Sequence, residues 1–215
     1  MTSMTRADVA KLPDPGVPMV FLNCPFPIPG YLAIGPHAMD GARRIVEHLL
    51  TVHHHQQVAF IAGETGDPDP EDRERGWRDA LRAHGRTDGP MIRTSFTLDG
   101  GYDAAQSMLN MAARPTAIFA SSDLQAYGVL HAIHDQGLRI PDDVAVVSFD
   151  GTAESAHAWP PLTLVQQPLT TMAEAAISGL LGHDQPGHTL LDMNMIIRQS
   201  CGCHTAGIAA GRPVQ

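Results

Sequence analysis

The sequence predicts an α/β protein in which mostly parallel sheets are covered by helices on both faces. Strand-like and helix-like segments alternate along the 215 residues, a pattern typical of this class. The continuous apolar run at 58–62, which closes on Gly63, is typical of a strand buried on both faces. Residues 116–148 contain two such runs joined by a helix that ends at Gly137. Because parallel neighbours need a crossover helix of this kind, the region is predicted to be a β-α-β unit.

Each predicted element rests on the spacing of its apolar residues. Short apolar or β-branched runs indicate strands, and apolar residues three or four positions apart indicate helices. In the first half these criteria give strands at 17–22, 31–34, 58–62 and 91–96, and helices at 41–50, 72–84 and 102–113. In the second half they give strands within 116–123 and at 144–148, 162–165 and 190–197, and helices before Gly137 and at 169–181. Residues 1–15 are polar and contain proline, so they are expected to be a flexible lead-in.

Polar and glycine residues mark the expected ends of several elements. Asp40 and Asp123 each precede a predicted helix and carry the side chain that an N-cap needs. Gly100 and Gly101 are expected to separate the strand that ends on Phe96 from the next helix.

The charge of the chain argues against direct binding of nucleic acid. Lys and Arg total 14 against 23 Asp and Glu, which gives a net charge of −9 without a basic cluster. Such a surface repels a phosphate backbone. No apolar run approaches the length of a membrane span, and the N-terminus lacks the charged start and apolar middle of a secretory signal. The expected location is therefore cytoplasmic, with no membrane contact.

Cysteine and histidine residues raise the question of a metal site. Cys201, Cys203 and His204 carry ligand atoms that suit zinc, but a closed structural site needs four ligands and only three lie together here. They also fall within residues 201–215, which are expected to be a disordered tail. The histidines at 53–55 are consecutive, so they point in different directions and cannot converge on one ion. These residues are interpreted as incidental, and neither a metal nor a cofactor is expected.

Several segments have the order and spacing of a known protein family. Among them are the βα turn at Asp123, the strand end at Val147-Ser-Phe-Asp150 and the closing residues 198–200. The other matching segments are residues 16–22, 40–41, 47–49, 58–63, 73–77, 114–120, 126–128, 137–144, 160–163 and 167–168. Through them the chain resembles the effector-binding core of lactose repressor/galactose repressor (LacI/GalR) family transcription regulators. The resemblance implies a periplasmic-binding-protein-like fold of two lobes.

The resemblance covers only part of a family member. Such proteins usually begin with a helix-turn-helix domain, which does not precede the strand predicted from residue 17, and the opening β-α units of the first lobe are also absent. An incomplete N-terminal lobe is therefore expected, with residues 16–50 as its remnant. A complete C-terminal ligand-binding lobe is expected at 51–165, and residues 166–200 would be closing segments shared between the lobes.

Polar and aromatic residues at strand ends are the candidate ligand contacts. Ligands of open parallel sheets bind beyond the carboxyl ends of the strands, where Ser122, Asp123 and Asp150 are expected. By its position in the family motif, Arg73 would supply a forked donor to hydroxyls or a carboxylate. Asp150 would accept hydroxyl hydrogens, and Phe96 would stack on a sugar or a base. Ser122 stands where the family often has asparagine.

Each candidate also has a simpler interpretation. Arg73 is alternatively a solvated residue at a helix start, and Asp150 is alternatively part of an Asp-Gly turn. For Asp123 the N-cap role is favoured over a ligand contact. Phe96 is as well explained by core packing as by ligand stacking.

The sequence favours a sensor over an enzyme. It contains no Gly-x-Ser-x-Gly elbow, Walker loop or Rossmann glycine fingerprint, so no catalytic activity is expected. The resemblance implies the ligand-sensing core of a transcription regulator, with a sugar or similar small polar effector and a homodimeric assembly. DNA would be bound only through a helix-turn-helix domain that this chain lacks. The alternatives are a stand-alone solute-binding protein of the same fold and a truncated remnant without function.

Overall fold

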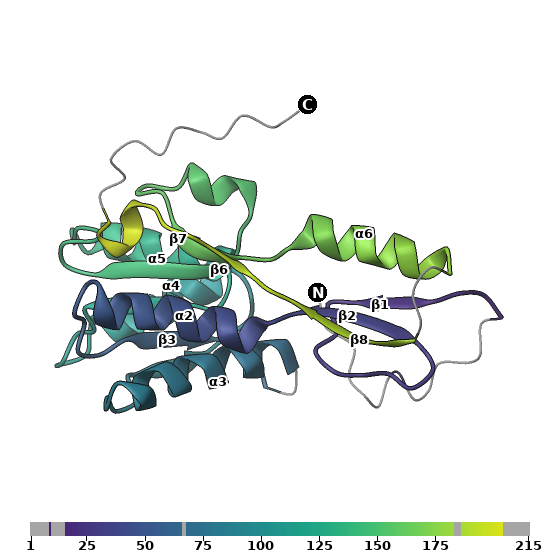
Figure 1. The fold of residues 1–215 in the computed structure, drawn as a ribbon. Helices are drawn as coiled ribbons and strands as arrows, with labels where there is room; N and C mark the ends of the chain where they lie inside the picture. The colour runs from purple at the N-terminus through teal and green to yellow at the C-terminus, as the bar shows by residue number, and fades with distance from the viewer. Residues whose placement is uncertain (1–8, 10–15, 66–67, 183–185, 204–215) are drawn as a thin grey trace.

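A six-stranded sheet forms the centre of the larger of two lobes in the computed structural model, which describes residues 9, 16–65, 68–182 and 186–203 (Figure 1). The strand order is β4-β3-β5-β6-β7-β9. The strands are β3 (Ala59–Ala62), β4 (Met91–Arg93), β5 (Ala117–Ala120), β6 (Ala145–Asp150), β7 (Thr163–Gln166) and β9 (Asn194–Ile196). Neighbouring strands are parallel except β7 and β9, which are antiparallel. The predicted fold class, α/β with mostly parallel sheets, is confirmed.

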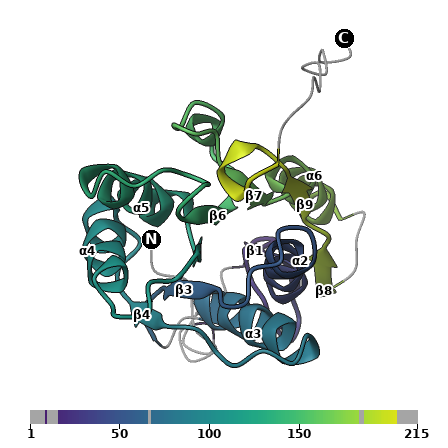
Figure 2. The ribbon, with the colours of Figure 1, turned by 90° about the vertical axis from the view of Figure 1, so that its left-hand side faces the viewer.

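Two pairs of helices cover the faces of this sheet (Figure 2). One pair is α2 (Ala38–Thr51) with α3 (Pro68–Ala83), and the other is α4 (Leu98–Leu109) with α5 (Asp123–Asp135). Under the first pair, Trp77 stacks on Phe60 with ring centroids 5.3 Å apart, and its indole nitrogen donates to the carbonyl of Val58 at 3.0 Å. This bond satisfies the polar atom of a completely buried ring. None of the helices in the described ranges is long and apolar enough to cross a membrane.

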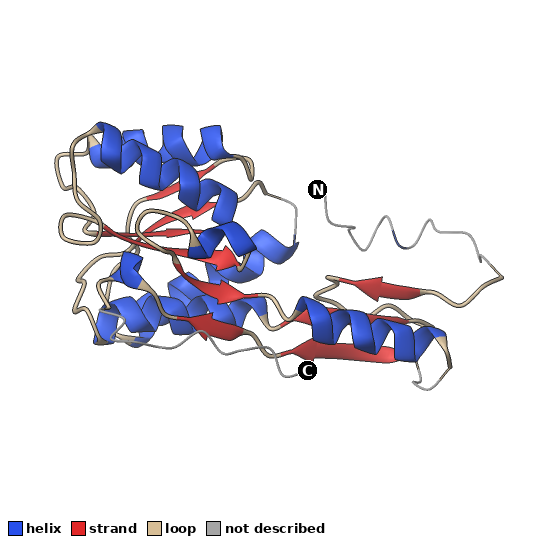
Figure 3. Cartoon of the chain, turned by 90° about the horizontal axis from the view of Figure 1, so that it is seen from above, coloured by secondary structure: helices blue, strands red, loops and turns tan. Residues whose placement is uncertain are grey.

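The smaller lobe is a parallel sheet with a helix on one face (Figure 3). Its described elements are β1 (Val20–Leu22), β2 (Leu32–Pro36), β8 (Gly187–Leu191) and α6 (Leu169–Leu180), with the strand order β1-β2-β8. Ile34, Met172 and Ala176 form the buried contact between sheet and helix. The opposite face carries a separate apolar cluster that includes Phe21 and Phe26. The lobe therefore has an apolar layer on both sides of its sheet.

The chain crosses between the lobes where a single strand is predicted at 190–197. The structure divides that strand into β8, which pairs with β2, and β9, which pairs with β7. Asp192 and Met193 separate the two strands, and Met193 is buried in the core of the larger lobe. The prediction of one strand is wrong, because alternation of side chains does not reveal where an extended chain changes sheets.

Helix α2 belongs to the larger lobe, which moves the expected boundary between the lobes. Residues 16–50 are expected to form the remnant of the N-terminal lobe, yet Ile45, Val46 and Leu49 are buried in the core of the larger one. Their apolar stripe packs against α3, β7 and β9. Helical periodicity predicts that such a stripe is buried, but it does not say under which sheet.

Several element ends differ from those expected. Asp40 lies in the first turn of α2 rather than at its N-cap. Gly100 and Gly101 lie inside α4, because the hydroxyl of Thr97 caps that helix by accepting from the amide of Gly100 at 3.0 Å. Strand β4 is also shorter than predicted, so Phe96 follows the strand instead of ending it. Element ends are the least certain part of a sequence prediction, and only at α4 does a side-chain cap account for the shift.

The start of the expected disordered tail is ordered. Cys201 ends the short 3-10 helix η2 (Gln199–Cys201) and is only 1% exposed. Ser200 fixes this helix to the sheet, because its hydroxyl donates to the carbonyl of Val146 at 2.6 Å and accepts from the amide of Thr163 at 2.8 Å. The tail expectation for residues 204–215, the lead-in expectation for residues 1–8 and 10–15, and His204 all lie outside the described residues.

Candidate functional site

Arg73 and Asp150 come together at the carboxyl ends of the central strands. Arg73 lies on α3, Asp150 is the last residue of β6, and the guanidinium nitrogen Nη1 lies 3.3 Å from the carboxylate oxygen Oδ1. The arginine side chain is 4% exposed, whereas the aspartate side chain is 28% exposed. A buried cation therefore supports an anion that solvent can reach. Arg73 is not the solvated helix-start residue of the simpler interpretation.

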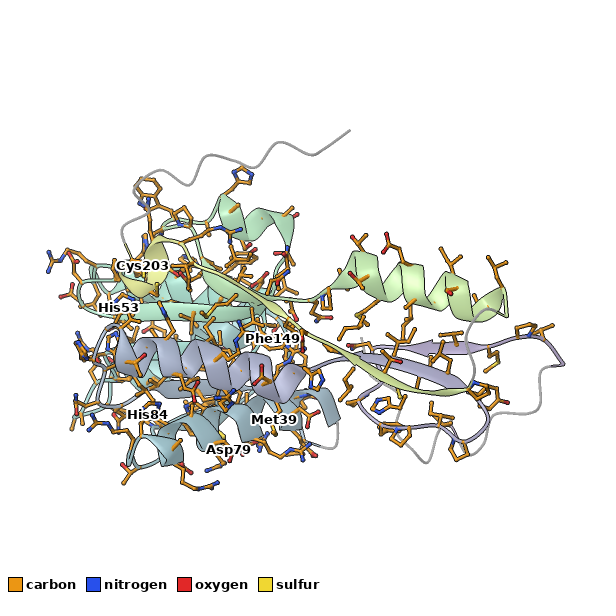
Figure 4. The ribbon with its side chains drawn as sticks, in the orientation of Figure 1. Met39, His53, Asp79, His84, Phe149 and Cys203 are labelled. Atoms are coloured by element: carbon orange, nitrogen blue, oxygen red, sulfur yellow. The ribbon has the colours of Figure 1, made fainter. Side chains whose placement is uncertain are left out.

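The guanidinium of Arg73 is held between the protein backbone and aromatic rings. It donates to the carbonyl of Ser121 at the end of β5. Its central carbon lies 4.0 Å from the ring centroid of Phe149 and 5.8 Å from that of Phe96. Planar guanidinium groups stack on aromatic faces and keep a fixed fork of donors. Figure 4 shows Phe149 on the side of the larger lobe that faces the smaller lobe.

The carboxylate of Asp150 is positioned by a second donor and by an unusual backbone conformation. The side-chain amide of Gln167 donates to Oδ1 at 2.9 Å. Asp150 has φ of +115° and is followed by Gly151 at +85°. Positive φ is uncommon for residues other than glycine and is retained only where the surrounding structure fixes it. Gln167 was not a predicted site residue, although it was among the matching segments of the family resemblance.

Phe96 lies in the turn before α4 and is partly exposed. Its ring packs over Gly63, so closely that a Cβ atom at Gly63 would clash with the ring. A hydrogen bond also stabilises the turn, because the buried side-chain amide of Gln125 donates to the carbonyl of Ser95 at 3.3 Å. The Phe96 ring therefore packs against the protein on one side and is accessible on another. Both interpretations from the sequence, core packing and ligand stacking, are compatible with this position.

Ser122 and Asp123 have structural roles that the sequence did not predict. Ser122, and not Asp123, is the N-cap of α5, because its hydroxyl accepts from the amide of Gln125 at 3.2 Å. Asp123 is the first residue of α5 and is completely buried. The favoured N-cap interpretation of Asp123 is therefore wrong. The position of Asp123 just before the apolar residues of the helix suggested a cap. In the structure its carboxylate instead points toward β6.

Asp123 fixes the loop that follows Asp150. Among the described residues, its oxygen Oδ2 accepts from the amide of Gly151 at 3.0 Å, and from the amide and hydroxyl of Thr152 at 2.7 and 2.9 Å. Its oxygen Oδ1 accepts from the hydroxyl of Ser148 at 2.6 Å. The Thr152 hydroxyl also lies 2.8 Å from that of Tyr127. Burial raises the pKa of Tyr127 above its ordinary value.

These residues offer the chemistry needed to bind a polyhydroxylated molecule. A carboxylate that solvent reaches accepts hydroxyl hydrogens, an adjacent guanidinium orients and balances it, and a partly exposed aromatic ring packs on apolar C–H groups. Asp150, Arg73 and Phe96 provide these groups at one edge of the sheet. Ser122 and Asp123 are both buried, and they stabilise this edge of the sheet from within the protein.

Comparison with known proteins identifies the fold family. The profile of the periplasmic binding protein-like domain matches residues 46–201, which is more than half of the chain. The chain belongs to this family. The matched range includes α3, the β5–α5–β6 unit and η2, and every residue of the candidate site lies within it.

Individual relatives of this family member are LacI-type regulators. The chain is 32% identical over 200 residues to the HTH-type transcriptional regulator CelR of Thermobifida fusca, covering 88% of the chain and 58% of that protein. It is 30% identical over 188 residues to the lactose operon repressor of Escherichia coli, covering 86% of the chain and 52% of the repressor. A solved CelR–cellobiose complex is 30% identical, with a TM-score of 0.76 over 86% of this chain and 59% of that one. The expected resemblance is confirmed, and the chain spans little more than half of these relatives.

Proposed function

We propose that this chain is the ligand-sensing core of a LacI/GalR-type transcription regulator. Its effector is a sugar or similar small polyol that binds against Asp150, Arg73 and Phe96. The observation that carries the proposal is the partly exposed Asp150 carboxylate, which two side chains orient from within the protein. A preoriented acceptor beside an aromatic ring is typical of small polar ligand sites. The complex of the relative CelR with cellobiose supports a carbohydrate.

The connections between the lobes support a change in lobe closure on binding. In the described part of the chain, short segments join β2 to α2, β7 to α6 and β8 to β9. Gln167, which holds Asp150, lies in the second of these connections. Ligand contacts at Asp150 are therefore coupled directly to a segment that must bend when the lobes close. A ligand that binds the closed arrangement more tightly shifts the population toward it.

A homodimer, cytoplasmic location and DNA contact through a separate helix-turn-helix domain follow from a role in transcription regulation. The net charge of −9 supports a separate DNA-binding domain, because this part repels phosphate. α6 exposes Leu169, Ile177 and Leu180 on the smaller lobe, which supports burial of that face against further protein in the complete assembly. The proposal includes no catalytic step.

Thermal unfolding with and without ligand tests the proposal. Cellobiose is the first probe, followed by other sugars, nucleosides and amino acids. A ligand at about 100 times its Kd stabilises the folded state by about 2.7 kcal/mol, which raises the Tm of a chain of this size by about 5–10 °C. We expect one carbohydrate to give such a shift and both Asp150→Ala and Arg73→Ala to abolish it. Arg73→Ala should also lower the Tm without ligand, because it removes a buried side chain.

Arg75→Ala is the matched control, because Arg75 lies on the same helix but its side chain is 65% exposed. This variant should keep the full ligand-induced shift. A carbohydrate shift of unchanged size in Asp150→Ala would contradict the proposed site. A chain that melts without a cooperative transition would favour the truncated remnant, and recovery of the native protein outside the cytoplasm would favour a stand-alone solute-binding protein.

A further inference from the structure

Four nitrogen and sulfur ligand atoms converge at the end of the larger lobe opposite the candidate ligand site. His48 lies in the last turn of α2, His53 follows that helix, and Cys201 and Cys203 lie at the end of η2. One ligand atom from each residue lies within 4.8 Å of all the others. Figure 4 shows His53 and Cys203 close to each other at this end, far from Phe149. The histidines and the cysteines are about 150 residues apart in the sequence, so their spacing does not predict that they converge.

Four of the six distances between these atoms match the edges of a zinc tetrahedron. With Zn–N bonds of about 2.0–2.1 Å and Zn–S bonds of about 2.3 Å, a regular tetrahedron has edges of about 3.3 Å between nitrogens and about 3.5 Å between nitrogen and sulfur. Nε2 of His48 lies 3.3 Å from Nε2 of His53 and 3.5 Å from each sulfur of Cys201 and Cys203. The sulfur of Cys203 lies 3.3 Å from Nε2 of His53. Four edges therefore already have the size that the ion requires.

The protein around the cluster fits its ligands to this arrangement. Gly202 has φ of +105°, which allows the chain to turn between Cys201 and Cys203. A Cβ atom at Gly202 would lie only 3.1 Å from Nδ1 of His53, so a side chain there would crowd the imidazole ring. The hydroxyl of Thr163 lies 3.1 Å from the sulfur of Cys201. Hydrogen bonds of this kind orient metal-bound thiolates.

We propose that His48, His53, Cys201 and Cys203 form a structural zinc site. Two imidazoles and two thiolates are the ligand types that zinc prefers, and four protein ligands fill its tetrahedral shell. The ion therefore has no open position for catalysis. It links η2 to the end of α2. His48 and Cys201, one ligand from each segment, are 153 residues apart in the sequence. A hollow of about 380 Å³ lined by His53, Cys201 and Cys203 gives the ion an entry path.

The proposal replaces the interpretation of the cysteines as incidental. That interpretation counted only neighbours in sequence, and His204, which it included, lies outside the described residues. It also treated the histidines at 53–55 as one group. In the structure only His53 joins the cluster, whereas His55 lies 3.0 Å from the hydroxyl of Thr116 and His54 is exposed.

Metal titration of the full chain tests the proposal. The reduced protein is stripped with a chelator and titrated with Zn²⁺, and with Co²⁺ as a spectroscopic probe, while Tm is measured in parallel. We expect one equivalent of Zn²⁺ per chain, a higher Tm, and the intense visible absorption of tetrahedral cobalt with thiolate ligands. Loss of a group that only hydrogen-bonds to a metal ligand weakens metal binding about 10–100-fold. Cys203→Ser removes a ligand itself, so it should weaken zinc binding by more than about 100-fold.

His54→Asn is the matched control, because it removes an adjacent exposed histidine and asparagine tolerates the left-handed backbone at φ of +58°. It should bind zinc as the wild-type chain does. Cys203 is chosen over the buried Cys201 because its partial exposure makes Cys203→Ser easier to fold. Absence of zinc binding by the wild-type chain with free thiols would overturn the proposal. So would a Cys201–Cys203 disulfide that persists in reductant, or stoichiometric zinc binding unchanged in Cys203→Ser. None of these outcomes depends on whether the chain binds a sugar.

Discussion

Replacing Gly128 by valine is expected to destabilise the larger lobe by about 3 kcal/mol or more. Gly128 lies on α5 where this helix packs closely against α4. A Cβ atom there would clash with the carbonyl of Leu98 and lie 2.5 Å from the amide nitrogen of Tyr102. The obstacle is backbone, which cannot rotate away as a flexible side chain can. The helices must therefore separate, and the contact is made on both sides, since Gly101 of α4 approaches the backbone of Gln125 in the same way.

Urea unfolding of Gly128→Val and His131→Val measures this effect with a matched control. His131 lies on the same helix, but its side chain is 61% exposed. Valine there should cost less than about 1 kcal/mol, because histidine and valine have similar helix propensities and the exposed His131 contacts Asp135 and Tyr102 only at the surface. Similar losses of unfolding free energy in the two variants would show that the close helix crossing does not control stability.

Replacing Asp123 by alanine is expected to have a comparably large effect. The change removes the acceptor for the amides of Gly151 and Thr152 and for the hydroxyl of Ser148. The Ser148 donor is completely buried and the two amide bonds are part-buried. Hydrogen bonds to charged groups contribute about 1.5–3 kcal/mol each, so the total loss should be about 3 kcal/mol or more. Because Gly151 follows Asp150 directly, the same change should also loosen the candidate ligand site.

Two measurements report the effect of Asp123→Ala. The free energy of unfolding reports the lost hydrogen bonds, and hydrogen exchange reports the freedom of the Gly151 and Thr152 amides. Asp142→Ala is the control, because Asp142 pairs with Arg139 on the surface and its side chain is 60% exposed. That variant should lose less than about 1 kcal/mol. If exchange at Gly151 and Thr152 stays as slow in Asp123→Ala as in wild type, the assigned role of Asp123 is wrong.

The sequence predicted the elements whose signals are local. The buried run that became β3 and the helix that became α5 were found because hydrophobic periodicity and a terminal glycine are visible within a short window. The family resemblance predicted that Arg73 and Asp150 share a site, and they lie 3.3 Å apart. Their relative burial could not be predicted, because it depends on how α3 packs across the sheet.

Features that depend on long-range packing were missed. Asp123 looks like an N-cap in sequence, and only the folded loop after β6 shows that its carboxylate has other donors. The apolar stripe of α2 predicted a helix but not its lobe. The histidines and cysteines of the proposed zinc site are brought together by η2 folding back onto α2. Sequence spacing contains no signal for contacts of this kind.

Residue-resolved NMR of the isotopically labelled chain tests the central claim most directly. The carbohydrate that raises Tm is titrated, and the backbone amide shifts are followed along the chain. The account predicts that the largest changes fall at Phe96, Gly151, Thr152 and Gln167, which surround Arg73 and Asp150. Changes confined instead to residues near His53 and Cys203, at the opposite end of the larger lobe, would contradict it.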